Sequence, residues 1–177
     1  TPNWKDTKNP IANAGEDQTV NEDTLVTFDG SASRDNIGIV SYVWAFTDVT
    51  AKMLKSAKPT GTYIFETPGI YLVILNVTDV GGNWAKDNVT ITVLDITKPV
   101  ANAGQNQTVT VGTPVTFNAS GSSDNVGIVS YEWDFGDNTS LVTENPVTNH
   151  TYNKPGNFNA TLTVRDEAGN FDTAYVV

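Results

Sequence analysis

The stretch Asp124–Asp137, DNVGIVSYEWDFGD, decides the fold, because a turn signal leads directly into an alternating strand. Its first four residues, Asp-Asn-Val-Gly, are typical of turns. Aromatic side chains then occupy every second position, at Tyr131, Trp133 and Phe135, with acidic residues between them. A period of two predicts a β-strand that buries one face, with Trp133 in the core.

The chain contains this stretch twice. Residues 35–48 read DNIGIVSYVWAFTD, and the longer segments 11–48 and 100–137 agree at 23 of 38 aligned positions, at an offset of 89 residues. Such a self-repeat predicts two copies of one structural unit. We therefore expect two domains, residues 1–95, with a core repeat that starts near residue 10, and residues 96–177.

Short alternating segments separated by turn-forming residues continue along both copies, and no segment has a convincing helical period. This pattern predicts an all-β fold of two tandem immunoglobulin-like antiparallel β-sandwiches, with about seven strands each and with Trp44 and Trp133 in the cores. Farther along the chain the offset falls to 87, so Val177 aligns with Thr90. The last strand of the second domain is therefore expected to be truncated, which predicts that the parent chain continues or that a neighbour completes the edge.

Several motifs of both copies resemble those of the PKD (polycystic kidney disease) domain family. Trp133–Asp137, WDFGD, matches the family signature, whereas the first copy departs from it with WAFTD at Trp44–Asp48. The opening Ala-Asn-Ala-Gly and the stretches around Pro-Gly are similar to the family as well. The resemblance implies an immunoglobulin-like sandwich without enzymatic activity, which serves as an extracellular spacer or interaction module in microbial surface proteins, secreted proteases, chitinases and collagenases. The tandem, rich in threonine and asparagine, most resembles archaeal surface-layer proteins.

The composition argues against several other classes of function. A net charge of −10 and an isoelectric point near 4.3 disfavour nucleic acid and anionic membrane surfaces, because both attract basic proteins. No apolar run approaches the roughly 18 residues of a membrane span, so we expect no membrane insertion. The chain has no cysteine and a single histidine, His150. A zinc site would lack its usual ligands and a Ser-His-Asp triad could form only once, so we expect no enzyme and no catalytic residue.

Acidic residues recur in register at two places in each copy, just before its first proline and in the turn that precedes the tryptophan strand. Calcium binds six to eight oxygens, and both places could lie at one end of a sandwich. Some PKD domains are similar in using this end for calcium. We therefore predict calcium as the only cofactor, stiffening the joint between the domains, with turn chemistry alone as the alternative. The predicted ligands are Asp6, Asp35, Asn36, Asp95, Asp124 and Asn125.

The outward positions of two neighbouring strands differ between the copies. Val43, Ala45, Leu72 and Ile74 are apolar in the first copy, where the second copy has acidic, asparagine and threonine residues. Contiguous exposed apolar surface usually marks a contact, so these four residues form a predicted interaction face. Three outcomes are open: residues 49–59 cover the face, a partner covers it, or nothing does.

Two further features concern the surface. Trp84 and Phe171 follow the two Gly-Asn turns in register, where they either stack on sugar rings or cap the core. Asn-x-Ser/Thr triplets are more frequent than chance predicts, which indicates either N-glycosylation of an exported chain or merely a composition rich in threonine and asparagine. The candidate glycosylation sites are Asn76, Asn88, Asn106, Asn118, Asn138, Asn149 and Asn159.

These observations predict a non-catalytic extracellular spacer or interaction module of a larger cell-surface protein, used for adhesion or presentation. The short linker Asp95–Pro99 ends in proline, which predicts a semi-rigid pair. The expected partners are other domains of the same longer chain and a protein or cell-wall polysaccharide surface, without nucleic acid. The alternative is an accessory module that binds polysaccharide or protein substrate for a secreted hydrolase.

Overall fold

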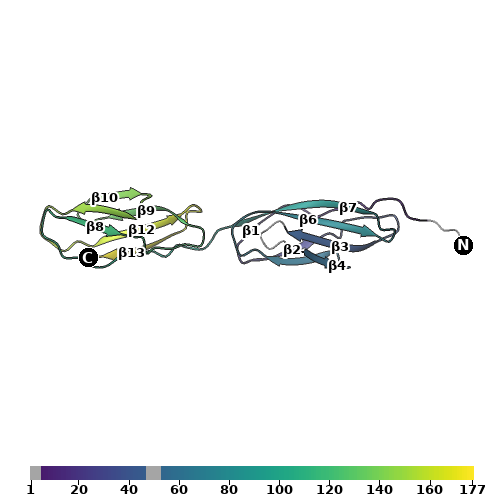
Figure 1. The fold of residues 1–177 in the computed structure, drawn as a ribbon, viewed down its shortest axis with the longest axis horizontal. Coiled ribbons are helices and arrows are strands. Elements are labelled where there is room, and N and C mark those ends of the chain that lie inside the picture. Colours follow the sequence, from purple (N-terminus) through teal and green to yellow (C-terminus); the bar gives the residue numbers. More distant parts are fainter. Residues whose placement is uncertain (1–4, 47–52) are drawn as a thin grey trace. The chain divides into compact units, whose positions relative to one another are not determined.

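Every regular element in the described part of the chain is a β-strand (Figure 1). The computed structural model describes residues 5–46 and 53–177, with the backbone alone for residues 53–56. The chain divides into two compact units, residues 1–95 and 96–177. Each unit buries its own hydrophobic core between two sheets, so the predicted all-β, immunoglobulin-like fold is confirmed.

The first unit packs a five-stranded sheet against a two-stranded one. The large sheet has the order β1-β7-β6-β3-β4, and the small sheet pairs β2 with β5. The strands are β1 (Gln18–Asn21), β2 (Leu25–Asp29), β3 (Ile39–Phe46), β4 (Met53–Ser56), β5 (Thr60–Ile64), β6 (Gly69–Asp79) and β7 (Trp84–Leu94).

Alternation along β3 builds the centre of this core. Tyr42, Trp44 and Phe46 are buried, whereas the residues between them are half-buried. The Trp44 ring lies 5.3 Å from the ring of Phe28 on β2, and its indole N–H donates a hydrogen bond to the Pro59 carbonyl oxygen at 3.4 Å. Trp44 therefore joins the two sheets, as the sequence pattern predicted.

The second unit repeats this plan. Its sheets have the orders β10-β9-β12-β13 and β11-β8. Trp133 takes the place of Trp44, fully buried with its ring 4.9 Å from the ring of Phe117. The strands are β8 (Pro114–Asn118), β9 (Ile128–Asp134), β10 (Ser140–Thr143), β11 (Val147–Thr151), β12 (Ala160–Asp166) and β13 (Phe171–Val176).

Two details differ from the predicted pair of antiparallel, seven-stranded sandwiches. β1 runs parallel to β7 and pairs with Ile91–Leu94, because β1 and β2 belong to different sheets and β1 adds to the open edge of β7. In the second unit six strands form, since residues 107–110, which align with β1, make no strand. No helix in the described part of the chain is long and apolar enough to cross a membrane.

A glycine turn after β9 is expected to be sensitive to substitution. Gly136 has a φ of +74°, and a Cβ there would lie 2.7 Å from the Asn159 carbonyl oxygen. We expect Gly136→Ala to lower the free energy of unfolding of the second domain by about 1–3 kcal/mol, because both the backbone and the contact become strained. Urea unfolding measures this loss. The matched control is Gly169→Ala, with φ +92° but open space around it, which should cost less. Equal losses would show that the contact contributes nothing.

A hydrogen bond to Asp172 ties the start of the second unit to β13. The Ala101 N–H donates to Asp172 Oδ2 at 2.9 Å, and this bond is the main reason why the pKa of the Asp172 carboxyl lies below its ordinary value. A depressed folded pKa contributes stability above the unfolded pKa of about 3.9, and that stability is lost as the pH falls through the folded pKa. We expect Asp172→Asn to unfold at lower urea than wild type at neutral pH, with a gap that narrows below about pH 4. Urea midpoints measured across this range check the prediction, which a pH-independent gap would contradict.

Candidate functional site

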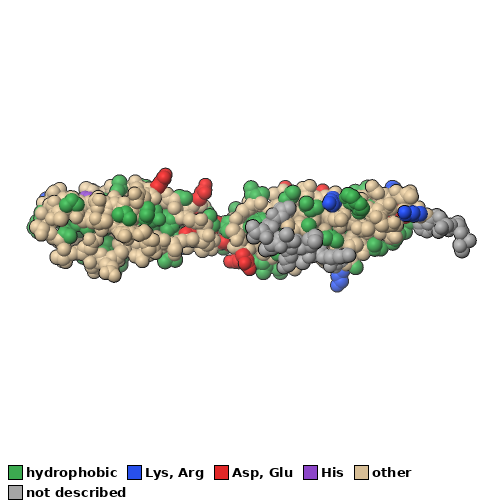
Figure 2. Space-filling view, in the orientation of Figure 1, with side chains coloured by type: hydrophobic (Ala, Val, Ile, Leu, Met, Phe, Trp, Pro, Cys, Tyr) green, Lys and Arg blue, Asp and Glu red, His purple; other side chains and the backbone are tan. Residues whose placement is uncertain are grey.

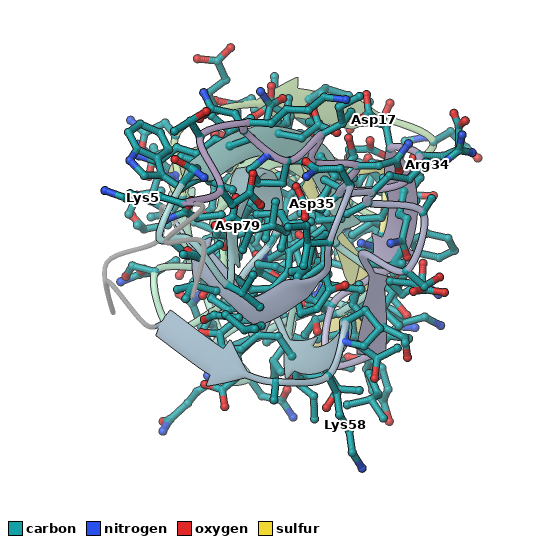
Figure 3. The ribbon with its side chains drawn as sticks, turned by 90° about the vertical axis from the view of Figure 1, so that its right-hand side faces the viewer. Lys5, Asp17, Arg34, Asp35, Lys58 and Asp79 are labelled. Atoms are coloured by element: carbon teal, nitrogen blue, oxygen red, sulfur yellow. The ribbon has the colours of Figure 1, made fainter. Side chains whose placement is uncertain are left out.

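Three aspartates of the first unit, Asp6, Asp35 and Asp79, bring their carboxylates together. One oxygen of each lies within 4.8 Å of the other two. Figure 3 looks onto this end of the unit and shows Asp35 and Asp79 close to each other. Asp6 and Asp79 are buried and Asp35 is half-buried. We call these residues the first aspartate cluster.

Asp79 is the last residue of β6 and begins the turn to β7. Its Oδ1 accepts a hydrogen bond from the backbone N–H of Asn83 at 2.9 Å, and its Oδ2 accepts one from Asn83 Nδ2 at 2.8 Å. Gly82, with a φ of +86°, supplies the left-handed conformation that closes this turn. The turn therefore fixes the Asp79 carboxylate in one orientation.

Asp35 lies in the loop between β2 and β3. Its Oδ2 accepts hydrogen bonds from the backbone N–H groups of Ile37 and Gly38, both at 2.8 Å. The bond from Ile37, followed by that from Gly38, lowers the pKa of Asp35, so this side chain is a carboxylate at neutral pH. Its Oδ1 is buried and has no hydrogen-bond partner among the described residues.

Asp6 belongs to the leading segment, residues 5–9, which precedes the repeat. Only 7% of Asp6 is exposed; its Oδ1 accepts a hydrogen bond from Lys8 N–H at 3.1 Å, whereas its Oδ2 is buried and lacks a partner in the described structure. Asn83 Nδ2 donates to the carbonyl oxygens of Asp6 at 3.1 Å and of Lys8 at 3.3 Å. A Cβ on Gly81 would lie 2.8 Å from the Asp6 carbonyl oxygen, so the leading segment packs directly onto the turn.

The first cluster therefore contains two buried carboxylate oxygens, Asp6 Oδ2 and Asp35 Oδ1, that no described group satisfies. Burial without a partner disfavours a charged carboxylate, and neighbouring negative charges add repulsion. A cation bound among the three carboxylates would remove both costs. Oxygen ligands suit Ca²⁺, Mg²⁺ or Mn²⁺ better than metals that prefer nitrogen and sulfur.

The geometry recurs at Asp95, Asp124 and Asp166, which we call the second aspartate cluster. One oxygen of each again lies within 4.8 Å of the others. Asp166 accepts hydrogen bonds from N and Nδ2 of Asn170, each at 2.8 Å. Asp124 Oδ2 accepts two backbone N–H bonds of its own turn, at 2.9 and 2.7 Å, and its Oδ1 is buried without a described partner. Asp95 is half-buried, so this cluster is less enclosed than the first.

Four of the predicted ligands, Asp6, Asp35, Asp95 and Asp124, lie in these two clusters, and their role as metal ligands stays a prediction. Two members of the clusters were not predicted. Asp79 and Asp166 complete the clusters, although the sequence pattern had marked their neighbourhood only as a turn. Each stands four residues before an asparagine, in register at an offset of 87, and this shared Asp could have been found by aligning the copies. Asn36 presents Nδ2, a donor, to Asp6 Oδ1 at 3.4 Å, and Asn125 is exposed.

The predicted interaction face lies on the outer side of β3 and β6. Leu72 is 41% exposed, and Val43, Ala45 and Ile74 are half-buried. Of the segment expected to cover them, Met53–Ser56 forms β4, which extends the sheet beside β3, while residues 47–52 lie outside the described residues. Figure 2 shows hydrophobic side chains scattered over the visible face of each unit. The partner of the predicted face stays a prediction.

Trp84 and Phe171 begin β7 and β13, and they are 57% and 48% exposed. A cation lies over each ring: Lys86 Nζ is 5.4 Å from the centre of the Trp84 ring, and the Arg165 guanidinium carbon is 4.9 Å from that of Phe171. Rings this exposed do not belong to the buried cores. Sugar stacking stays a prediction for both.

The candidate glycosylation sites differ in access. Asn76 is half-buried within β6 and its Oδ1 is buried, so it is the least accessible of the seven predicted acceptors. The other acceptors are exposed, and their modification stays a prediction; they are Asn88, Asn106, Asn118, Asn138, Asn149 and Asn159.

His150 lies on β11 with its Nε2 2.8 Å from Asp137 Oδ2. Its ring stacks on Phe135, with centroids 4.1 Å apart. In the first unit Tyr63 holds the aligned position and stacks on Phe46 at 4.4 Å. The packing of an aromatic ring at this position is therefore common to both domains, and it accounts for His150 without a catalytic role.

Comparison with known proteins gives a family for both units. The family model of the PKD domain matches residues 7–93 and 96–176. The mouse Dyslexia-associated protein KIAA0319 homolog is 32% identical over 166 residues, which cover 86% of this chain and 15% of that protein. Collagenase ColQ1 of Bacillus cereus (strain Q1) is 43% identical over 56 residues, or 31% of this chain and 6% of the collagenase. The chain thus spans a small part of these relatives.

Among solved structures, the N-terminal eight Ig domains of Down Syndrome Cell Adhesion Molecule (isoform 1.30.30) align with a TM-score of 0.55 and 17% identity, covering 94% of this chain and 23% of that one. At this identity the likeness shows the immunoglobulin-like fold alone. PKD and immunoglobulin-like domains are typically non-catalytic. Because the family model matches both units along nearly their full lengths, this chain belongs to the PKD domain family, of which it holds two tandem copies.

Proposed function

We propose that this chain is a non-catalytic interaction and spacer module of an extracellular surface protein, and that each of its domains binds one calcium ion. The family supports the first part, because PKD domains recur in larger proteins and the chain spans only 15% of the KIAA0319 homolog. The net charge of −10 suits a soluble surface that attracts cations. Adhesion to a protein or cell-wall surface would use exposed faces of the sandwiches.

The observation that carries the calcium proposal is the buried Asp6 Oδ2, which belongs to one of three clustered carboxylates and has no hydrogen-bond partner among the described residues. An oxygen in this state is poorly solvated and available as a ligand. Asp35 Oδ1 offers a second oxygen of the same kind, and Asp79 is held in place by Asn83. Calcium accepts irregular oxygen cages, whereas Mg²⁺ demands near-octahedral geometry and retains waters, so calcium suits this site better.

The function of such an ion would be mechanical. In the first domain it would link the leading segment, through Asp6, to the loop at Asp35 and the strand end at Asp79. In the second cluster it would link Asp95 to Asp124 and Asp166 in the same way. Chain segments that would otherwise fray would then be held to the folded domain, which suits a module that transmits force or presents a neighbouring domain.

Calorimetry tests this proposal. We expect wild type, freed of metal by a chelator, to bind two Ca²⁺ per chain, with affinities in the range of about 10⁻⁴–10⁻³ M typical of extracellular modules. Asp35→Asn and Asp124→Asn should each bind one ion, and the double variant none. Absence of binding to wild type at millimolar calcium would end the calcium proposal and leave the spacer function standing.

A second candidate function is an accessory substrate-binding module of a secreted hydrolase. The match to collagenase ColQ1 favours it, together with the exposed Trp84 and Phe171 rings. Pull-down of the chain on insoluble collagen, chitin and cellulose tests it. Binding that is lost in Trp84→Ala and Phe171→Ala would support this function over a simple spacer. If the chain binds none of the three solids, it is not a binding module for collagen, chitin or cellulose.

A further inference from the structure

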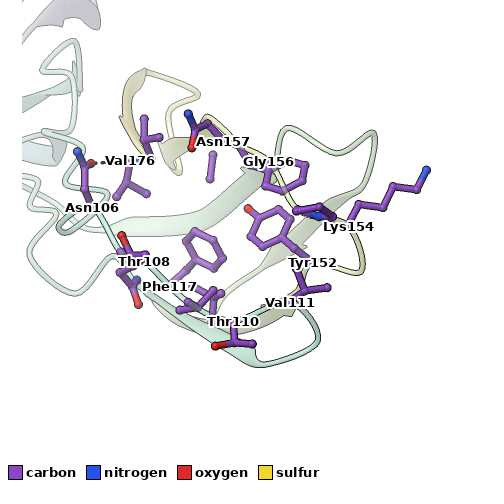
Figure 4. A pocket seen from close by; sticks show the side chains of 17 residues that line it. Asn106, Thr108, Thr110, Val111, Phe117, Tyr152, Lys154, Gly156, Asn157 and Val176 are labelled. Carbon is purple, nitrogen blue, oxygen red and sulfur yellow. Dashed lines mark hydrogen bonds between the residues drawn. The ribbon is translucent and has the colours of Figure 1, made fainter.

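The second domain presents two exposed aromatic rings on the outer face of its larger sheet. Phe171 and Tyr175 both belong to β13, and they are 48% and 70% exposed. Val176 is buried and borders the pocket that Phe117 and Tyr152 line (Figure 4), so its neighbour Tyr175 points to the opposite, outer face. The two rings stand four positions apart on one strand, a separation of about 13 Å along the strand.

The outward residues of three neighbouring strands form a regular array, which we call the outer grid. Pairing across the strands puts Arg165 between Ser130 and Phe171, and Thr161 between Asp134 and Tyr175. Apart from the two rings, every member of the grid is polar or charged. The members are Ser130, Glu132 and Asp134 of β9, Thr161, Thr163 and Arg165 of β12, and Phe171, Thr173 and Tyr175 of β13.

An ion pair holds the polar part of the outer grid in place. Arg165 Nε donates a hydrogen bond to Glu132 Oε1 at 2.7 Å, and the guanidinium carbon lies 4.9 Å from the centre of the Phe171 ring. Both side chains of the pair are partly exposed, Arg165 by 39% and Glu132 by 34%. Oε2 of Glu132 and the Nη groups of Arg165 make no hydrogen bond within the described part of the chain. Donors and acceptors are therefore fixed side by side and open to a ligand, which lowers the entropy cost of binding.

The first domain has the same sheet positions but different chemistry. The aligned residues are Val43, Ala45, Thr78 and Asn88, in place of Glu132, Asp134, Arg165 and Tyr175. Asn88 is exposed although β7 continues beyond it to Leu94, so this position is open to solvent in both domains. Trp84, in the place of Phe171, is the one aromatic ring kept at these positions. The combination of two rings with a fixed ion pair is therefore specific to the second domain.

We infer that the outer grid binds an extended, neutral polysaccharide of the cellulose or chitin type, an inference that rests on the second candidate function above. The apolar faces of the sugar rings stack on Phe171 and Tyr175, and their hydroxyl groups bond to Glu132 and Arg165. A hydroxyl both donates and accepts hydrogen bonds, so it suits a carboxylate beside a guanidinium. Two rings about 13 Å apart on one strand suit a ligand that is straight and longer than a single sugar.

Charge and side-chain type favour this ligand over two others. Acidic polysaccharides would be repelled, because the chain carries a net charge of −10 and the grid itself sets two carboxylates against one guanidinium. The middle of the grid is Thr163, which lies between Glu132 and Thr173. The centres of protein interfaces are instead depleted of acidic residues and serine, so a protein partner fits this face less well.

Calorimetry with soluble hexasaccharides of cellulose and of chitin tests the site on the full chain. We expect Tyr175→Ala to weaken binding about tenfold and Tyr175→Phe to keep it, because stacking needs the ring alone. Glu132→Gln should weaken binding as well, since it releases Arg165 from its ion pair. The matched control is Trp84→Ala, which removes an exposed ring from the first domain and should leave the affinity unchanged. An amylose hexasaccharide, whose chain coils, should not bind.

The outcomes distinguish the site from the function on which it rests. Sugar binding that persists in Tyr175→Ala, or that Trp84→Ala abolishes, would overturn the outer grid as the site and leave the candidate function standing. Binding of amylose as tight as that of cellulose would overturn the preference for a straight chain. If wild type binds neither hexasaccharide, the sugar site is wrong, and retention on collagen would then indicate a protein ligand. If it binds none of the three solids either, the candidate function falls as well.

Discussion

Trp44→Ala is expected to lower the free energy of unfolding of the first domain by about 3–5 kcal/mol, at the upper end of the range for a single core substitution. The indole is 0% exposed and touches both sheets, and no smaller side chain can fill its space in a close-packed core. A domain with about 5–15 kcal/mol of stability would lose much of its margin. Urea unfolding followed by circular dichroism measures the loss, with the second domain as an internal reference.

The two tryptophans should differ when replaced by phenylalanine. The Trp44 N–H donates to the Pro59 carbonyl oxygen, whereas the Trp133 N–H is buried and without a hydrogen-bond partner among the described residues. Trp44→Phe therefore loses both side-chain volume and a hydrogen bond. Trp133→Phe loses the same volume but also removes a buried donor without a described partner, and this removal should offset the loss of stability by about 1–3 kcal/mol. We expect Trp133→Phe to be clearly the milder change. If it proves the more damaging one, the indole N–H of Trp133 has a partner in solution.

The effect of Asp6→Asn on the melting temperature of the first domain is expected to change sign when calcium is added. In a chelator, the variant should melt a few degrees above wild type, because it removes one negative charge from three carboxylates that lie within 4.8 Å. With calcium at about 100 times its Kd, wild type gains about 2.7 kcal/mol, or about 10–20 °C in a domain of this size. The variant should gain much less at the first domain, so the order of the two melting temperatures reverses. Thermal melting of both proteins in each condition measures this crossover.

Asp23→Asn is the matched control for this crossover. It removes the same charge from the same domain, but Asp23 precedes β2, whereas Asp35 of the first aspartate cluster follows β2, so the length of this strand separates Asp23 from the cluster. The φ of Asp23, +58°, suits asparagine as well. Its melting temperature should rise with calcium as much as that of wild type. A parallel loss of the calcium effect in both variants would attribute it to net charge rather than to a bound ion.

The sequence pattern was most informative where the alternation of apolar residues along a strand coincides with the face that the strand buries in the core. Tyr131, Trp133 and the aromatic residues of β3 alternate in sequence and are buried as predicted. The period of two left no choice of face for them, because only one face of each strand can be apolar and still find a core. The parallel pairing of β1 with β7 was not predictable in this way, since it joins residues more than 70 positions apart and depends on which sheet edge stays open.

The aspartate clusters show the same division. Asp6 and Asp35 could be proposed as neighbours because the repeat placed equivalent residues at Asp95 and Asp124. Asp79 looked like one residue of a turn, and its role depends on the end of β6 being folded beside the other two. The side-chain nitrogen of Asn36, which faces Asp6, also depends on this packing.

The sequence by itself determined the duplication, the sandwich fold, the inward tryptophans and the family, because each of these follows from a local sequence motif that occurs in both copies. The tertiary structure alone decided that three carboxylates lie close together and that two of their oxygens are buried without a hydrogen-bond partner among the described residues. These features arise between segments distant in sequence. Their distances and burial are set by how strand ends and loops pack, which no local period encodes.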